Sequence, residues 1–150
     1  MAHTHSYRAT LSWRGETCGY DGYSREYSVA IPGKPRFRGS ADAAFKGDAG
    51  LYNPEDMLVV SLATCHMLSY LAVCARLGIT VLAYDDEAEG IMAIKDKRMR
   101  FTEVTLHPRV TLAAGADEAR AQTAHERAHD ECFIANSVNF PVRHEATIVR

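Results

Sequence analysis

A long apolar segment in the middle of the chain restricts the fold more than any other feature. Asn53 is a favoured helix-capping residue, Pro54 fits the first helical position, and two acidic residues follow in the first turn. Gly78 is typical of the position just after a helix. The sequence therefore predicts a helix that runs from Pro54 to about Leu77. Because it is apolar on several faces, we expect it to be central and mostly buried. Its interspersed polar residues favour a buried helix over a membrane span.

Strand-like segments with turn residues between them lie on both sides of this helix. They cover residues 7–13, 25–31, 36–39, 80–94, 101–112 and 142–149, with a loop over 40–52. A second helix is predicted from Asp117 to about Cys132. This order indicates an α+β fold in which two main helices pack on a largely antiparallel sheet. The 150 residues are enough for one domain, which we expect to cover residues 1–150.

The net charge bears on which partners the protein binds, and the start of the chain bears on where in the cell we expect it. The formal net charge is −2, so there is no general electrostatic reason to expect binding to nucleic acid or to a membrane. The first residues lack the apolar run of a signal peptide. We therefore expect a cytoplasmic protein.

Four cysteines are the candidate reactive groups, and none are spaced as Cys-x-x-Cys. Cys65 and Cys74 lie nine positions apart on the predicted long helix, on opposite faces and ~13 Å apart along the axis, too far for a disulfide. Cys74 has apolar neighbours and is expected to be core, whereas Cys18 lies in a probable loop and is expected to be exposed. Cys132 comes at the end of the second helix, where a thiol can reach another element. Free or catalytic thiols are therefore a better interpretation of the four cysteines than a disulfide framework or a zinc site.

The segment His125–His129 matches H-E-x-x-H, in which two histidines can bind zinc and the glutamate can act as a base. No third ligand is evident, since Glu145 falls in a probable strand beyond the helix. Two histidines on a solvent-exposed helix face would give the same letters. We therefore predict no metal site, with a metal-dependent hydrolase or a structural metal bound with Cys132 as weaker alternatives.

Five segments, taken together and in order, resemble the OsmC/organic-hydroperoxide-resistance (Ohr) family, in particular a branch of OsmC-like peroxiredoxins. They are Tyr23–Tyr27, Gly39–Asp48, Asn53–Leu58, Ala63–Leu68 and His129–Val138. An Asn-Pro-Glu helix start followed by one cysteine in the same helix and a second cysteine near the end of the chain is fairly specific to that family. The resemblance covers nearly the whole chain.

The resemblance implies a fold, an assembly and roles for four residues. Members of the family are intertwined homodimers with active sites at the dimer interface. By resemblance, Cys65 is the peroxide-attacking cysteine and Cys132 the resolving cysteine. Glu55 matches the acidic residue of the helix start, and Arg25 is the candidate for the arginine that pairs with it and stabilises the thiolate.

The function implied by the resemblance is thiol-dependent reduction of organic hydroperoxides in oxidative-stress defence. Such an enzyme needs no bound cofactor, but it needs an external dithiol reductant, which in relatives is often a lipoyl group. Apolar residues near Cys65 (Leu58, Leu62 and Leu68) favour a hydrophobic peroxide. Two departures are His66 after the first cysteine, where relatives have Phe, and Phe133 after the second, where they have Pro. A redox-sensing or ligand-binding dimer without turnover is the alternative.

Overall fold

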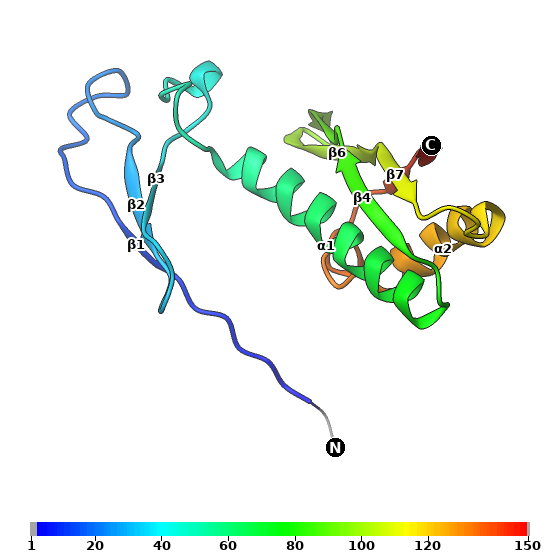
Figure 1. The fold of residues 1–150 in the computed structure, drawn as a ribbon. Helices are drawn as coiled ribbons and strands as arrows, with labels where there is room; N and C mark the ends of the chain where they lie inside the picture. The colour runs from blue at the N-terminus through cyan, green and yellow to red at the C-terminus, as the bar shows by residue number, and fades with distance from the viewer. Residues whose placement is uncertain (1–2, 150) are drawn as a thin grey trace. The chain divides into compact units, whose positions relative to one another are not determined.

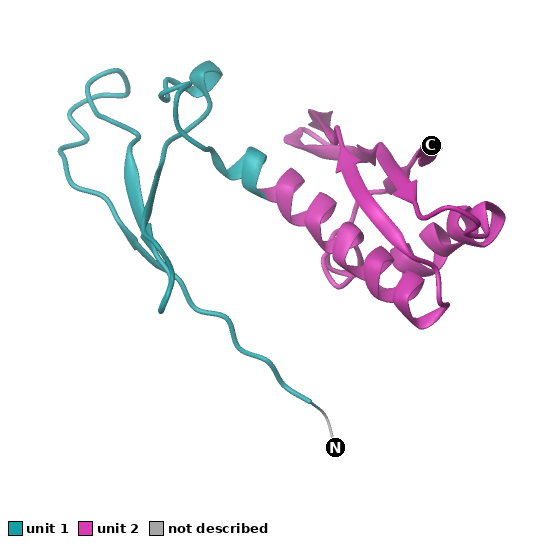
Figure 2. Cartoon of the chain, viewed as in Figure 1, with its two compact units in different colours: residues 1–57 teal, residues 58–150 magenta. Residues whose placement is uncertain are grey.

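The computed structural model describes residues 3–149 (Figure 1). It divides into two compact units, residues 1–57 and residues 58–150 (Figure 2). The expectation of one domain over residues 1–150 therefore stays a prediction.

The first unit holds a three-stranded antiparallel sheet with the strand order β1-β2-β3. Its strands are β1 (Thr10–Ser12), β2 (Tyr27–Ala30) and β3 (Phe37–Gly39). The predicted hairpin between the second and third strands is confirmed, but the first two strands are shorter than predicted because pairing stops where no partner lies opposite. Tyr27 lies opposite Gly39, and a Cβ at Gly39 would collide with the Tyr27 ring. The glycine is therefore required by its neighbour across the sheet.

Helix α1 (Pro54–Arg76) begins and ends as predicted. The Asp56 N–H donates to Asn53 Oδ1 at 2.7 Å, and the Asn53 N–H donates to Asp56 Oδ2 at 3.3 Å, so the two residues cap each other. At the other end, Gly78 has a φ of 71° and the Ile79 N–H donates to the Cys74 carbonyl at 2.9 Å. This pattern is the glycine-terminated C-cap that the sequence predicts.

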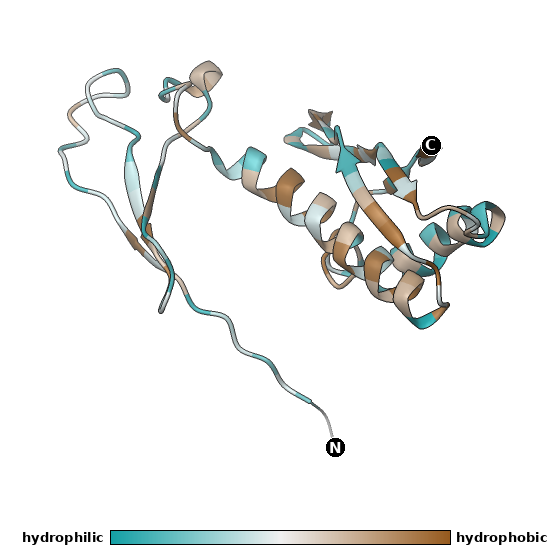
Figure 3. Cartoon of the chain, viewed as in Figure 1, coloured by the Kyte–Doolittle hydropathy of each residue, from teal (hydrophilic) through white to brown (hydrophobic). Residues whose placement is uncertain are grey.

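The burial of α1 differs from the expectation that the helix is mostly buried. Only 28% of its most apolar window is buried inside the chain. Leu62, His66, Tyr70 and Val73 recur at helical spacing on its buried face, while other positions such as Leu68 remain exposed. By length and composition α1 is apolar enough to cross a membrane, a property that core helices of soluble proteins share. In Figure 3, hydrophobic turns of the helix alternate with paler ones, and its first turn is hydrophilic.

The second unit holds two three-stranded sheets, ordered β4-β7-β9 and β5-β6-β8. The strands are β4 (Val81–Asp86), β5 (Glu89–Lys95), β6 (Arg98–Leu106), β7 (Pro108–Leu112), β8 (Val142–His144) and β9 (Thr147–Val149). The β4–β7 and β5–β6 pairs are antiparallel, and the β6–β8 and β7–β9 pairs are parallel. With α1 and the helix described next, this arrangement confirms the α+β prediction of two helices with largely antiparallel strands.

Three predicted strands, 80–94, 101–112 and 142–149, are each divided in two in the structure. Each break moves the chain from one sheet to the other. Hydrogen bonds fix two of the breaks: the His107 N–H donates to Asp86 Oδ1 at 2.7 Å, and the Glu145 N–H donates to the Leu106 carbonyl at 2.8 Å.

Helix α2 (Glu118–Glu131) is capped by Asp117, whose carboxylate accepts from the Arg120 N–H at 3.0 Å, and it ends at Cys132. Both ends match the prediction. Three alanines on its buried face let it pack closely in one core cluster, and a second, smaller cluster surrounds Leu62 on α1. The buried residues of the first cluster are Tyr70, Val73, Cys74, Ile79, Val110, Ala121, Ala124 and Ala128. Cys74 is therefore a core residue, as predicted.

Candidate active site

The structure brings together the two thiols that the sequence analysis paired. Cys65 is half-buried on α1, and Cys132 is buried at the C-terminal end of α2. The two side chains are close enough to interact through a hydrogen bond, and both are free thiols. The Ala135 N–H donates to Cys132 Sγ at 3.4 Å, in the turn that follows α2. Two free thiols therefore approach each other, one from α1 and one from the C-terminal end of α2.

The two thiols differ in their electrostatic environment. Burial raises the pKa of Cys132 to about 11, and its hydrogen bond with Cys65 acts in the same direction. Cys132 is therefore protonated at neutral pH. Cys65 is the more accessible of the two, so an external oxidant meets its sulfur first.

The structure does not pair Arg25 with Glu55. Arg25 donates hydrogen bonds to the carbonyl oxygens of Tyr20 and Tyr23, and its guanidinium lies 3.7 Å from the centre of the Tyr23 ring. Burial raises the pKa of Tyr27, and the negative charge of Glu55 raises it further. Arg25 and Glu55 belong to the first unit, whereas Cys65 and Cys132 belong to the second. The activating role of Arg25 and Glu55 stays a prediction.

A buried pair of histidines, one next to Cys65 in the chain and one on α2, was missed by the sequence analysis. His66 Nε2 and His125 Nδ1 are 3.0 Å apart. Both residues are buried: 1% of the surface of His66 is exposed, and 0% of that of His125. The His125 ring stacks on Tyr70 at 3.9 Å between centroids, and His144 lies 5.3 Å from His66. The alternative that both histidines of this segment lie on a solvent-exposed face is wrong for His125, because His66 and Tyr70 of α1 pack against it. The sequence did carry one indication that this face of α2 is buried, namely the three alanines on it: Ala121, Ala124 and Ala128.

Burial makes both histidines hard to protonate. Burial, together with the charge of the neighbouring histidines, lowers the pKa of His66 to about 4 and that of His125 to about 3. Near pH 7 the pair is therefore neutral. A neutral imidazole has one donor and one acceptor nitrogen, so one histidine donates to the other.

The histidine geometry does not favour a metal site. No group of three His, Cys, Asp or Glu side chains within residues 3–149 is placed to hold a metal ion. His125 Nδ1 is already engaged by His66, and the ring centroids of His129 and His144 are 5.9 Å apart.

We predict less than about one zinc ion per ten chains in protein purified without added metal, because chelation by His125 would break its bond to His66. Elemental analysis by plasma mass spectrometry checks this, with the His129→Ala variant as a control for adventitious binding. Stoichiometric zinc that is lost in His129→Ala would contradict the prediction.

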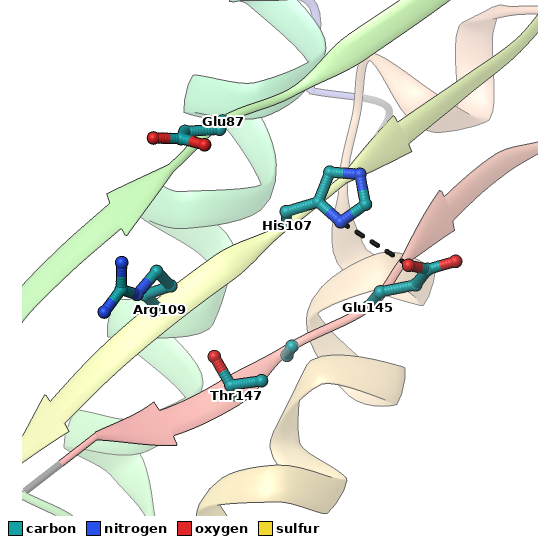
Figure 4. Close-up of a pocket in the computed structure, with 6 residues that line it drawn as sticks. Glu87, His107, Arg109, Glu145 and Thr147 are labelled. Atoms are coloured by element: carbon teal, nitrogen blue, oxygen red, sulfur yellow. Dashed lines mark ion pairs between the residues drawn. The ribbon is translucent and has the colours of Figure 1, made fainter.

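A pocket of about 400 Å³ lies on the β4-β7-β9 side of the second unit (Figure 4). It is lined by Glu87, His107, Arg109, Glu145, Ala146 and Thr147. His107 Nδ1 and Glu145 Oε2 are 3.5 Å apart, and Arg109 has no ion pair with another described residue. None of the predicted site residues lines this pocket, so it is separate from the thiol pair.

Comparison with known proteins identifies relatives by sequence. A family model described as OsmC-like protein matches residues 47–147. The uncharacterized protein YmaD of Bacillus subtilis (strain 168) is 26% identical over 101 residues, which are 64% of this chain and 67% of that protein.

Solved structures share the fold over almost the entire chain. An OsmC-like protein of unknown function from Vibrio cholerae is 27% identical, with a TM-score of 0.88, and the match covers 96% of this chain and 100% of that one. An organic hydroperoxide resistance protein from Elizabethkingia anophelis is 19% identical, with a TM-score of 0.73 over 100% of this chain and 99% of that one. One from Legionella pneumophila is 16% identical, with a TM-score of 0.72 over 99% and 100%.

Proposed function

Because the chain belongs to the OsmC-like protein family, we propose that it is a cysteine-based reductase of organic hydroperoxides. The observation that carries the proposal is the contact between an accessible thiol, Cys65, and a buried, protonated thiol, Cys132. Two structural relatives are named organic hydroperoxide resistance proteins, which is consistent with this activity. The reaction would serve in defence against oxidative stress.

The first step is attack of the Cys65 thiolate on one oxygen of the peroxide. The S–O bond forms as the O–O bond breaks, and the departing alkoxide takes a proton to become the alcohol. Sulfur is oxidised to a sulfenic acid while the peroxide is reduced. The proposed role of Arg25 is to stabilise the thiolate and polarise the peroxide, with Glu55 orienting its guanidinium.

The second step forms the disulfide. Cys132 attacks the Cys65 sulfur, the S–O bond breaks, and the hydroxide leaves as water with the Cys132 proton. Burial of Cys132 supports its role as the resolving cysteine. Peroxide in solution does not reach the buried Cys132 sulfur, whereas a sulfenic acid on the neighbouring Cys65 does. A dithiol reductant, such as a lipoyl group, then restores both thiols by exchange.

The substrate preference rests on fewer residues than the sequence suggested. Leu62 is fully buried in the core with Val104 and Leu106, so it is not available to contact a peroxide. Leu58 is partly buried and Leu68 is 62% exposed. We propose that a hydrophobic peroxide is preferred through such accessible apolar side chains.

The proposed assembly is a homodimer with active sites at its interface. It is supported by apolar side chains that α1 and the segment after α2 leave exposed: Val60 (57%), Leu68 (62%) and Phe133 (80%). A second copy that covers them would remove this surface from water.

We expect light scattering after gel filtration to give twice the mass of one chain. Leu68→Glu is expected to shift the protein toward the monomer, because it would place a charge in an apolar interface. The matched control is Leu82→Glu, which adds the same charge at a similarly exposed leucine (65%) on β4. A wild-type protein that runs as a monomer at micromolar concentration would contradict the proposed dimer.

One equivalent of cumene hydroperoxide, followed by a non-reducing digest and mass spectrometry, tests the proposed function. We expect a Cys65–Cys132 disulfide at once, and its reduction by dihydrolipoamide with renewed peroxide consumption. A free Cys65 after treatment would refute the peroxidase proposal. A bridge that forms once and is not reduced by any dithiol would favour a redox sensor instead.

A further inference from the structure

We propose that the buried His66–His125 pair is a positioning element that holds Cys65 and Cys132 together and thereby sets the equilibrium between dithiol and disulfide. The inference builds on the proposed function, from which it takes the thiols as a redox pair. It assigns a role to the H-E-x-x-H segment that the proposed reaction leaves unused.

Each histidine shares a helix with one of the thiols. His66 follows Cys65 directly on α1, and His125 precedes Cys132 by seven residues on α2. Seven residues are almost two full helical turns, so His125 lies on the side of α2 toward which Cys132, the residue at which the helix ends, follows. The histidine bond therefore joins α1, one residue after Cys65, to α2, about 10 Å along the axis before Cys132.

Two other side-chain bonds that join the same helices are less suited to this role. Tyr70 donates its hydroxyl to the Ala121 carbonyl at 3.1 Å, eleven residues before Cys132. Arg76 pairs with Glu131 at 2.5 Å, but 51% and 37% of these side chains are exposed, so solvent weakens the pair. The histidine bond is fully buried, where a hydrogen bond restricts geometry most.

The surroundings of the pair give its hydrogen bond a direction. His125 Nε2 is buried and has no hydrogen-bond partner among the described residues. A buried N–H without a partner is rarer and more costly than an unused lone pair. The proton of His125 therefore lies on Nδ1, which donates to His66 Nε2.

This direction makes a matched pair of substitutions available at one position. In His125→Asn the side-chain amide nitrogen takes the place of Nδ1, and the donor is kept. In His125→Gln the amide nitrogen reaches instead toward the position of Nε2, and the donor to His66 is lost. Both variants are polar and neutral, so they differ mainly in whether the helices remain bonded beside the thiols.

The experiment measures the disulfide equilibrium in glutathione buffers without peroxide. In this equilibrium, one glutathione disulfide oxidises the Cys65 and Cys132 thiols. The products are the Cys65–Cys132 disulfide and two glutathione thiols. Alkylation, digestion and mass spectrometry quantify the bridge. We expect the equilibrium constant to fall about tenfold in His125→Gln, a rise of about 30 mV in the reduction potential. In His125→Asn it should stay within about threefold of wild type.

Tyr70→Phe is the control for a general loss of stability. It also removes a buried bond between α1 and α2, but far from Cys132, so we expect lower thermal stability with an unchanged equilibrium constant. The proposal is overturned if His125→Gln matches wild type, if Tyr70→Phe shifts the constant equally, or if the wild type forms no bridge.

The outcome is distinguishable from failure of the proposed function. A protein whose bridge depends on His125 but which consumes no hydroperoxide would refute the peroxidase and support the positioning role. A protein that consumes hydroperoxide, but whose bridge equilibrium is the same in both His125 variants, would support the peroxidase proposal and refute the positioning role.

Discussion

Cys65→Ser is expected to lower the rate of organic hydroperoxide reduction by on the order of a thousandfold or more, because a serine hydroxyl does not ionise near neutral pH and is a weak nucleophile. Of the two paired thiols, Cys65 is the one accessible to an oxidant. The measurement is peroxide consumption under steady-state conditions with an excess of dithiol. Equal rates in wild type and Cys65→Ser would contradict the assignment.

Cys132→Ser should behave differently. It leaves Cys65 able to react once, so we expect about one equivalent of peroxide to be consumed per chain before turnover stops. Without its partner, the sulfenic acid is open to further oxidation, which mass spectrometry detects as two and then three added oxygens. Trapping with dimedone reports the first intermediate.

Cys18→Ser is the matched control for both variants. Cys18 is an exposed free thiol in the first unit, and its sulfur donates to Glu16 Oε2 at 3.6 Å. We expect its substitution to leave the rate unchanged. If Cys18→Ser were as inactive as Cys65→Ser, the reactive thiol would be misassigned.

The helices were predictable because their signals are local. Asn53 and Asp56 cap the start of α1 with their own side chains, and Gly78 ends the helix through its own backbone conformation. Asp117 caps α2 in the same way. The same locality explains the correct placement of Cys132 at a helix end. None of these features depends on a distant partner.

The strand breaks and the histidine pair were not predictable because they depend on distant partners. The alternation of residues 101–112 continues through His107, where the chain changes sheets and the His107 N–H donates to the carboxylate of the distant Asp86. His125 is buried by α1, and its bonded partner lies 59 residues away. A sequence shows the polarity of such a residue, but its burial depends on what the rest of the chain packs against it.

Lowering the pH from 7 to 4.5 is expected to reduce the free energy of unfolding by on the order of 3–5 kcal/mol through His66 and His125 alone. Burial lowers their pKa values to about 4 and about 3 in the folded protein. In the unfolded chain each titrates near 6.5. Between these values the unfolded chain binds more protons, so acid favours unfolding. The loss therefore starts as the pH falls below about 6.5 and continues until the folded pair itself takes up protons.

Other groups modify this slope without reversing it. Burial lowers the pKa of His144 too, although the nearby Glu126 opposes the shift, so His144 adds to the acid sensitivity. Burial raises the pKa of Asp86, which has the opposite effect, because its protonation favours the folded state as the pH falls. Asp86 is a single group whose hydrogen bond from His107 lowers its pKa and so limits the shift, whereas three histidines act in the destabilising direction.

Urea unfolding at several pH values between 7 and 4.5 measures the effect, with the His66→Leu/His125→Leu double variant as the comparison. The double variant has no titrating group at this position, and replacing both partners of a buried hydrogen bond with apolar residues of similar size costs little. We expect its unfolding free energy to change much less than that of wild type over this range. An identical dependence on pH in the two proteins would show that the histidine pair is not the source of the acid sensitivity. A flatter curve in the double variant would show that protonation of the buried histidines causes the acid sensitivity.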